Sequence, residues 1–138
     1  MLRLEWTAIY AGVNIFILLV LAVLVVAGRR KHKIRLGDAG NEDFLRAVRA
    51  HANAAEYIPA GLIGILLLAL MEPLGLDASP LWVFHSAAVS LTVGRILHAI
   101  GLHTGVLNAG RMLGMALTWL SYLLISGGLL WAGLSSSA

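Results

Sequence analysis

The 138-residue sequence contains no cysteine, and only 12% of its residues are charged. The missing thiols exclude disulfide bonds, thiolate metal sites and a cysteine nucleophile, so any thiol chemistry must use a thiol that a ligand brings. The shortage of charge, together with 59% hydrophobic residues, excludes an ordinary soluble domain. So short a chain cannot build a core large enough to bury helices that are apolar all round. The sequence therefore predicts an integral membrane protein.

Four apolar segments are long enough to cross a bilayer as helices. We predict these helices at about residues 6–28, 41–71, 81–102 and 110–131, with Asn41 as the N-cap of the second. The predicted fold class is all-α, a membrane four-helix bundle that forms a single domain over residues 1–138. Asn14 is the clearly polar residue inside the first apolar segment. We expect it to make a hydrogen bond to another helix, with a ligand contact as the alternative.

Positive charge is concentrated directly after the first apolar segment. The basic residues there are Arg29, Arg30, Lys31, Lys33 and Arg35. The turn at residues 72–80, by contrast, has two acidic side chains and no Lys or Arg. Because Lys and Arg favour the cytoplasmic side, this distribution predicts that both termini lie outside. Most of these cations would serve topology and lipid headgroups, and one or two would reach an anionic ligand at the cytoplasmic mouth.

The second apolar segment carries a polar stripe. Arg46, Arg49, Asn53 and Glu56 follow one another at spacings of three, four and three, which places them on one face of an α-helix. Ionisable groups at membrane depth cost roughly 2.5 to 3.5 kcal/mol each, so they usually have a partner or a function. The stripe should therefore face protein or a water-filled cleft.

Further charged residues lie toward the same, cytoplasmic ends of the predicted helices. Arg95 and His98 are three residues apart in the third segment, and Arg111 begins the fourth. Several arginines beside one glutamate leave an excess of positive charge, which favours an anionic ligand or a thiolate. We predict that Arg111 stabilises a thiolate, because the dipole at a helix start adds to its field. Contact with lipid headgroups is the alternative for this residue.

A peptide with two carboxylates, one ammonium and one thiol would match these groups. Arginines bind carboxylates bidentately, Glu56 would bind the ammonium, and the Asn53 amide can both donate and accept. The histidines show no spacing typical of a metal site, so we expect no metal. His51 would contact a neighbouring subunit or pack at the membrane interface, and His98 would line the same pocket as Arg95.

Two groups of residues carry a family resemblance. In the second segment they are Arg49, Ala50, His51, Asn53, Glu56, Tyr57 and Pro59. They resemble the R-A-x-x-N-x-x-E-x-x-P signature of the membrane-associated proteins in eicosanoid and glutathione metabolism, the MAPEG family. Arg95 and His98, followed by Arg111, are similar to the R-x-x-H and later Arg of its microsomal glutathione transferase and prostaglandin E synthase branches. The hydropathy profile agrees over essentially the whole chain, and the short polar links resemble those of a bacterial member.

The resemblance implies a homotrimer in a bacterial inner membrane that binds glutathione between adjacent subunits at the cytoplasmic side. The implied glutathione-binding residues are Arg29, Arg30, Arg49, His51, Asn53, Glu56, Tyr57, Arg95 and His98. Arg111 is the implied catalytic residue. Leu102 and Met112 stand where several relatives carry Tyr and Ser, which argues against a prostaglandin isomerase.

The expected function is therefore that of a glutathione-dependent membrane enzyme in detoxification. Glutathione would enter from the cytoplasm, a hydrophobic electrophile would enter from the bilayer, and the thiolate would attack it. Conjugation of the electrophile and reduction of a lipid hydroperoxide are both compatible with the residues. Two alternatives stay open: a small proton-coupled multidrug-type transporter that uses Glu56, and a non-catalytic lipid-binding relative.

Overall fold

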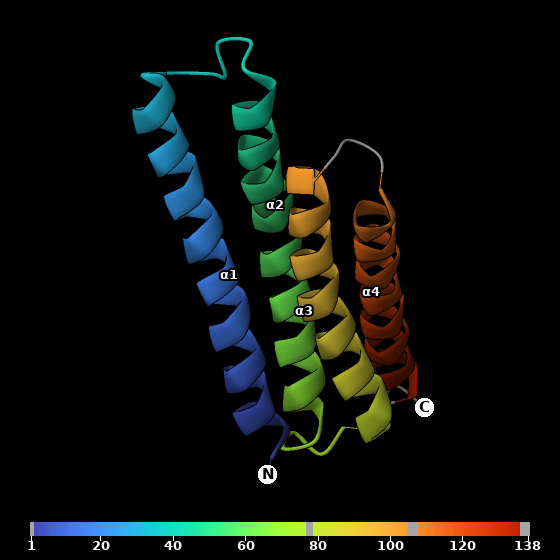
Figure 1. Cartoon of the computed structure of the whole chain (residues 1–138). Helices are drawn as coiled ribbons and strands as arrows, with labels where there is room; N and C mark the ends of the chain where they lie inside the picture. The colour runs from blue at the N-terminus through green and yellow to red at the C-terminus, as the bar shows by residue number, and fades with distance from the viewer. Residues whose placement is uncertain (1, 77–78, 105–107, 136–138) are drawn as a thin grey trace.

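The computed structural model describes residues 2–76, 79–104 and 108–135, and within them it shows four helices and no strand. The helices are α1 (Arg3–His32), α2 (Glu42–Met71), α3 (Leu81–Thr104) and α4 (Ala109–Ser135). They lie side by side, with both chain ends at the same end of the bundle (Figure 1). Each helix is long and apolar enough to cross a membrane. The predicted all-α membrane bundle is confirmed.

The helices α1 and α4 extend beyond the predicted ranges 6–28 and 110–131 at both ends. α1 continues to His32 through four basic residues, which interact favourably with the negative end of the helix dipole. Lys33 then ends it in the left-handed conformation. The side chain of Asn41 accepts a 2.8 Å hydrogen bond from the Phe44 N–H, so Asn41 caps α2 as predicted. At this end α1 and α2 reach further than α3 and α4 (Figure 1).

Glycines allow α3 and α4 to approach closely. A Cβ atom added to Gly94 would lie 2.8 Å from the main-chain oxygen of Gly114. One added to Gly114 would lie 2.5 Å from the main-chain nitrogen of His98. Small residues permit such backbone contact between membrane helices. The close approach brings His98 of α3 beside Arg111 of α4, where Nδ1 of His98 lies 3.3 Å from the Arg111 carbonyl oxygen.

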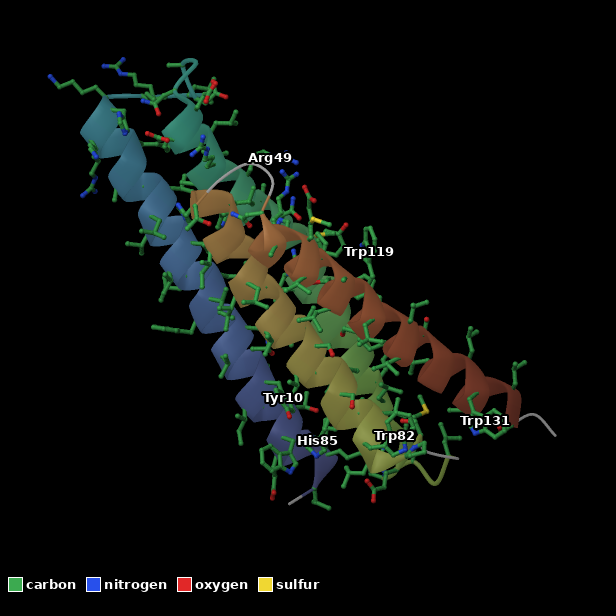
Figure 2. The ribbon with its side chains drawn as sticks, turned by 45° about the vertical axis from the view of Figure 1, so that its right-hand side comes forward. Tyr10, Arg49, Trp82, His85, Trp119 and Trp131 are labelled. Atoms are coloured by element: carbon green, nitrogen blue, oxygen red, sulfur yellow. The ribbon has the colours of Figure 1, made fainter. Side chains whose placement is uncertain are left out.

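Two apolar clusters hold the helices together. Toward the chain termini the buried members are Ile65, Leu68, Ala69, Phe84, Ala87, Ala88, Leu91 and Ile125. Toward the opposite end they are Leu21, Ala50, Ala54, Ile58, Ala99 and Leu102. The exposed side chains of Trp82 and Trp131 lie toward the end with the termini, and Arg49 lies toward the other end (Figure 2). Tryptophan is enriched where a membrane surface meets water, which suits that position.

α1 contributes least to the interior, since only 11% of its most apolar window is buried by the rest of the chain. Its polar anchor is Asn14, which is fully buried. The Asn14 Nδ2 group donates to Oγ1 of Thr92 on α3 at 2.8 Å. The predicted hydrogen bond from Asn14 to another helix is therefore confirmed. The remaining face of α1 is left to lipid or to another protein surface.

Candidate functional site

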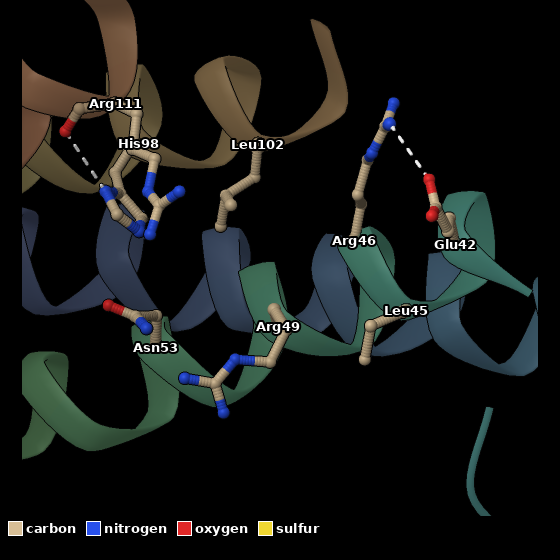
Figure 3. Close-up of a pocket in the computed structure, with 8 residues that line it drawn as sticks. All are labelled: Glu42, Leu45, Arg46, Arg49, Asn53, His98, Leu102 and Arg111. Atoms are coloured by element: carbon tan, nitrogen blue, oxygen red, sulfur yellow. Dashed lines mark hydrogen bonds and ion pairs between the residues drawn. The ribbon is translucent and has the colours of Figure 1, made fainter. Parts of the chain in front are cut away.

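A cavity of about 320 Å³ lies where α2, α3 and α4 meet, at the end of the bundle opposite the chain termini. Its lining residues are Glu42, Leu45, Arg46, Arg49, Asn53, His98, Leu102 and Arg111 (Figure 3). The volume falls within the range of small-molecule sites, roughly 300 to 1,000 Å³. Four of the predicted site residues are thus brought together, namely Arg49, Asn53, His98 and Arg111.

Positive charge dominates the wall of this cavity. Arg46 and Arg49 come from α2 and Arg111 from α4, whereas Glu42 is the only carboxylate among the lining residues of the described chain. Arginine presents a planar fork of donors that matches carboxylates and similar anions. The cavity is therefore suited to a ligand that carries more than one negative group.

His98 forms the α3 side of the wall, and only 4% of it is exposed. Because a carbonyl oxygen only accepts, the contact to the Arg111 carbonyl requires the proton on Nδ1. The other ring nitrogen, Nε2, is buried and has no hydrogen-bond partner among the residues that the structure describes. A buried polar atom without a partner is costly, so a polar group of a ligand would stabilise this ring.

Asn108 positions Arg111, and the sequence reasoning missed it. Its Oδ1 accepts from the Arg111 N–H at 3.0 Å, while its Nδ2 donates to the Gly101 oxygen at 2.7 Å. The side chain therefore caps the start of α4 and ties it to the end of α3. An asparagine close to the start of a predicted helix is a recognisable capping signal, and Asn108 stands three residues before Arg111.

Arg95 and Tyr57 are not among the lining residues, although both were predicted to belong to the site. Arg95 is 1% exposed, and its Nε and Nη2 donate to Oγ1 of Thr118 at 3.0 and 2.6 Å. The Tyr122 hydroxyl donates to the Tyr57 carbonyl at 2.8 Å. These residues link α2, α3 and α4 farther into the bundle than the cavity.

His51 and Glu56 also lie outside the cavity lining. His51 is half-buried, and Glu56 is exposed on the surface of α2. The polar stripe is therefore divided: Arg46, Arg49 and Asn53 face the cavity, and Glu56 continues along the helix beyond it.

The two arginines at the end of α1 have different surroundings. The Nη1 group of Arg29 donates to the carbonyl oxygens of Arg35 and Gly37 at 3.5 and 3.3 Å, and its guanidinium carbon lies 5.3 Å from the centre of the Phe44 ring. Arg30 is exposed. Neither lines the cavity of the single chain, where Arg29 instead holds the connection between α1 and α2.

Comparison with known proteins gives a match along most of the chain. A family model described as MAPEG family matches residues 7–131. Two relatives named Inner membrane protein YecN, from Escherichia coli strain K12 and from Escherichia coli O6:H1, are each 34% identical over 125 residues. The match covers 91% of this chain and 90% of each relative. The residues matched by the family model include every residue that lines the cavity.

Proposed function

The chain belongs to the MAPEG family of membrane proteins, and on this premise we propose that it is a glutathione-dependent enzyme. In this proposal the cavity binds glutathione as a thiolate, which is conjugated to a hydrophobic electrophile or reduces a lipid hydroperoxide. The observation that carries the proposal is the meeting of Arg49, Asn53, His98 and Arg111 in one cavity. The sequence has no cysteine, so the reactive thiol must belong to the substrate.

Each lining side chain has a chemical role in this proposal. Arg49 binds a carboxylate of the tripeptide, and Asn53 donates to or accepts from its amide groups. Arg111 lies beside the sulfur and lowers the pKa of the glutathione thiol from about 8.5, because a fixed positive charge favours the thiolate. His98 offers its unpartnered Nε2 to a polar hydrogen of the ligand.

The apolar co-substrate would reach the sulfur from the bilayer. Leu45 and Leu102 supply an apolar part of the wall. In conjugation by substitution, the sulfur lone pair forms a carbon–sulfur bond and the leaving group departs with its electron pair. In conjugation to an alkenal, the sulfur adds to the carbon–carbon double bond, whose π electrons take up a proton from water. In hydroperoxide reduction, two glutathione molecules are oxidised to the disulfide while the hydroperoxide is reduced to an alcohol and water. In both reactions the protein contributes proximity and stabilisation of the thiolate.

We further propose a homotrimer in a bacterial inner membrane, with the cavity toward the cytoplasm. The names of the two YecN relatives place those proteins in the inner membrane. An exposed carboxylate such as Glu56 is costly against lipid, and a neighbouring copy would remove that cost. In such an assembly a neighbouring copy would cover Glu56, and Arg30 of one copy would reach the cavity of the next.

The proposal is tested with purified protein in detergent by glutathione binding and by the ultraviolet absorbance of the bound thiolate. Arg111→Ala should remove the thiolate absorbance and lower turnover by about 10²- to 10³-fold, as the loss of one preorganised charge-stabilising group does elsewhere. Arg111→Lys keeps the positive charge and should retain part of the signal. Halonitrobenzenes, lipid hydroperoxides and reactive alkenals serve as co-substrates.

The outcomes separate the candidate functions. An unchanged thiolate signal in Arg111→Ala would assign the activating role to another residue. Absence of glutathione binding by the wild-type protein would contradict the proposal and favour a proton-coupled transporter or a non-catalytic lipid-binding protein.

A further inference from the structure

Glu42 and Arg46 place opposite charges side by side on the rim of the cavity. They lie one helical turn apart on α2, and both line the cavity. Oε2 of Glu42 is 3.9 Å from Nη2 of Arg46, and Oδ1 of Asp43 is 3.6 Å from Nη1 of Arg46. Asp43, although it also pairs with Arg46, is not a lining residue. Glu42 is therefore the carboxylate that this rim presents to a ligand.

The ion pairs on the rim are loose enough to be exchanged. Both distances exceed the 2.7 to 2.9 Å or so of a charge-assisted hydrogen bond. The Glu42 side chain is 85% exposed and that of Arg46 is 28% exposed. Exposed ion pairs of this kind contribute little to stability, because water and salt screen them. A ligand with matching charges can replace them at small cost.

The rest of the cavity indicates that a ligand binds beside this rim. His98 is 4% exposed and lines the same cavity, and its buried Nε2 has no partner within the described part of the chain. Among the described residues, the lining contains the cations Arg46, Arg49 and Arg111 and one carboxylate, Glu42. Glutathione as a thiolate carries two carboxylates, one thiolate and one ammonium. The charges of the cavity therefore complement those of the ligand group by group.

We propose that Glu42 and Arg46 together bind the α-amino acid end of the γ-glutamyl residue. Arg46 binds its α-carboxylate and Glu42 binds its α-ammonium. This inference rests on the proposed function and specifies how one end of the same ligand is held. The carboxylate and the ammonium share one carbon atom, so they need two neighbouring groups of opposite charge, which the rim provides. Glu56, which we expected from the sequence to bind the ammonium, is not among the lining residues.

The test compares two ligands and two matched variants of the full-length protein in detergent. The ligands are glutathione and its des-amino analogue, in which hydrogen replaces the ammonium and the carboxylates remain. Glu42→Gln and Asp43→Asn each remove one negative charge and one partner of Arg46. Glu42→Gln should weaken glutathione binding by about 5- to 10-fold and leave binding of the analogue unchanged. Asp43→Asn should change neither affinity.

Two further variants complete the test. Arg46→Gln should weaken both ligands by a similar factor, because both keep the α-carboxylate. Equal effects of Glu42→Gln and Asp43→Asn, or a loss in Glu42→Gln that is the same for both ligands, would overturn the inference. The inference would also be overturned if Glu56→Gln weakened binding of glutathione and left binding of the des-amino analogue unchanged. A wild-type protein that binds neither peptide overturns the proposed function itself, which separates the two failures.

Discussion

The guanidinium carbon of Arg95 lies 4.9 Å from the centre of the Tyr57 ring, so a cation of α3 rests against an aromatic ring of α2. The same guanidinium donates to Thr118 of α4. No carboxylate pairs with it among the described residues, and its Nη1 is buried without a hydrogen-bond partner. Arg95 thus joins three helices through hydrogen bonds and ring contact, directly beside the helix segments that carry the cavity.

Arg95 is therefore predicted to stabilise the bundle. Arg95→Ala should lower the free energy of unfolding by about 2–4 kcal/mol, because it leaves a cavity and removes the hydrogen bonds to Thr118. Arg95→Met keeps most of the volume and should cost about half as much. Chemical denaturation in detergent measures both values.

Glutathione binding distinguishes this role from direct contact with the ligand. If Arg95→Met loses glutathione affinity while its unfolding free energy stays at the wild-type value, Arg95 contacts the ligand, as its position in the R-x-x-H pattern implied. If only Arg95→Ala loses stability and glutathione affinity together, and Arg95→Met keeps its affinity, Arg95 has the structural role.

The close contact between α3 and α4 predicts an effect of a single methyl group. Gly114→Ala should cost about 1–3 kcal/mol of unfolding free energy, because its Cβ would lie 2.5 Å from the main-chain nitrogen of His98 and the helices must separate. The same separation moves His98 relative to Arg111, so glutathione affinity should fall as well. Differential scanning calorimetry and binding measurements check the two effects.

Gly127→Ala is the matched control on the same helix. No atom of the described residues lies within 4 Å of a Cβ at Gly127, and alanine is the better helix former by about 0.8–1 kcal/mol. This variant should be as stable as the wild type or slightly more stable. If both alanine variants behave alike, the glycine contact does not set the distance between α3 and α4.

The sequence contained enough information for the four helices, the Asn41 cap and the Asn14 hydrogen bond, since each follows from local pattern and from the cost of polar groups in lipid. The polar stripe was less informative. Its spacing defines a helix face, but the length of the cavity along that face depends on side chains from other helices. Tyr57 and Tyr122 pack together across α2 and α4, with ring centres 5.8 Å apart, beyond the cavity.

The same limit applies to α3. A spacing of three suggested that Arg95 and His98 share a pocket, yet Arg95 turns toward Thr118, which accepts two of its hydrogen bonds. Which way a long side chain turns depends on the partner that the adjacent helix offers. Asn108 shows the converse, because its local capping pattern was present in the sequence and identifies a residue that positions Arg111.

The contacts of Arg29 predict that it protects the connection between α1 and α2. Arg29→Ala removes the donor to two loop carbonyls and the contact with the Phe44 ring. Trypsin cleavage after Lys33 or Arg35 should then be about 2- to 5-fold faster, since exposed cation–π contacts contribute about 0.5–1 kcal/mol and cleavage follows the open population.

Arg30→Ala is the control, because Arg30 is exposed beside Arg29 and carries the same charge. It should leave cleavage after Lys33 or Arg35 unchanged. If Arg30 completes the cavity of a neighbouring copy, the same variant should lower glutathione affinity. Faster cleavage in both variants would mean that net charge, and not the contacts of Arg29, protects the loop.

The hydrogen bond between Asn14 and Thr92 is predicted to couple α1 to α3. Asn14→Ala and Thr92→Val should each destabilise the bundle, and the double variant should lose less than the sum by about 0.6 kcal/mol and at most about 1.7 kcal/mol. Thr7→Val is the matched control, because Thr7 is a buried threonine of α1 whose hydroxyl donates only within its own helix, to the Arg3 carbonyl. The effect of Thr7→Val on stability should add to that of Asn14→Ala.

Since little of α1 is buried by the other helices, loss of the hydrogen bond between Asn14 and Thr92 should weaken the attachment of α1 more than the same change would between α3 and α4. Additive losses in the Asn14 and Thr92 pair would show that apolar contacts alone hold α1.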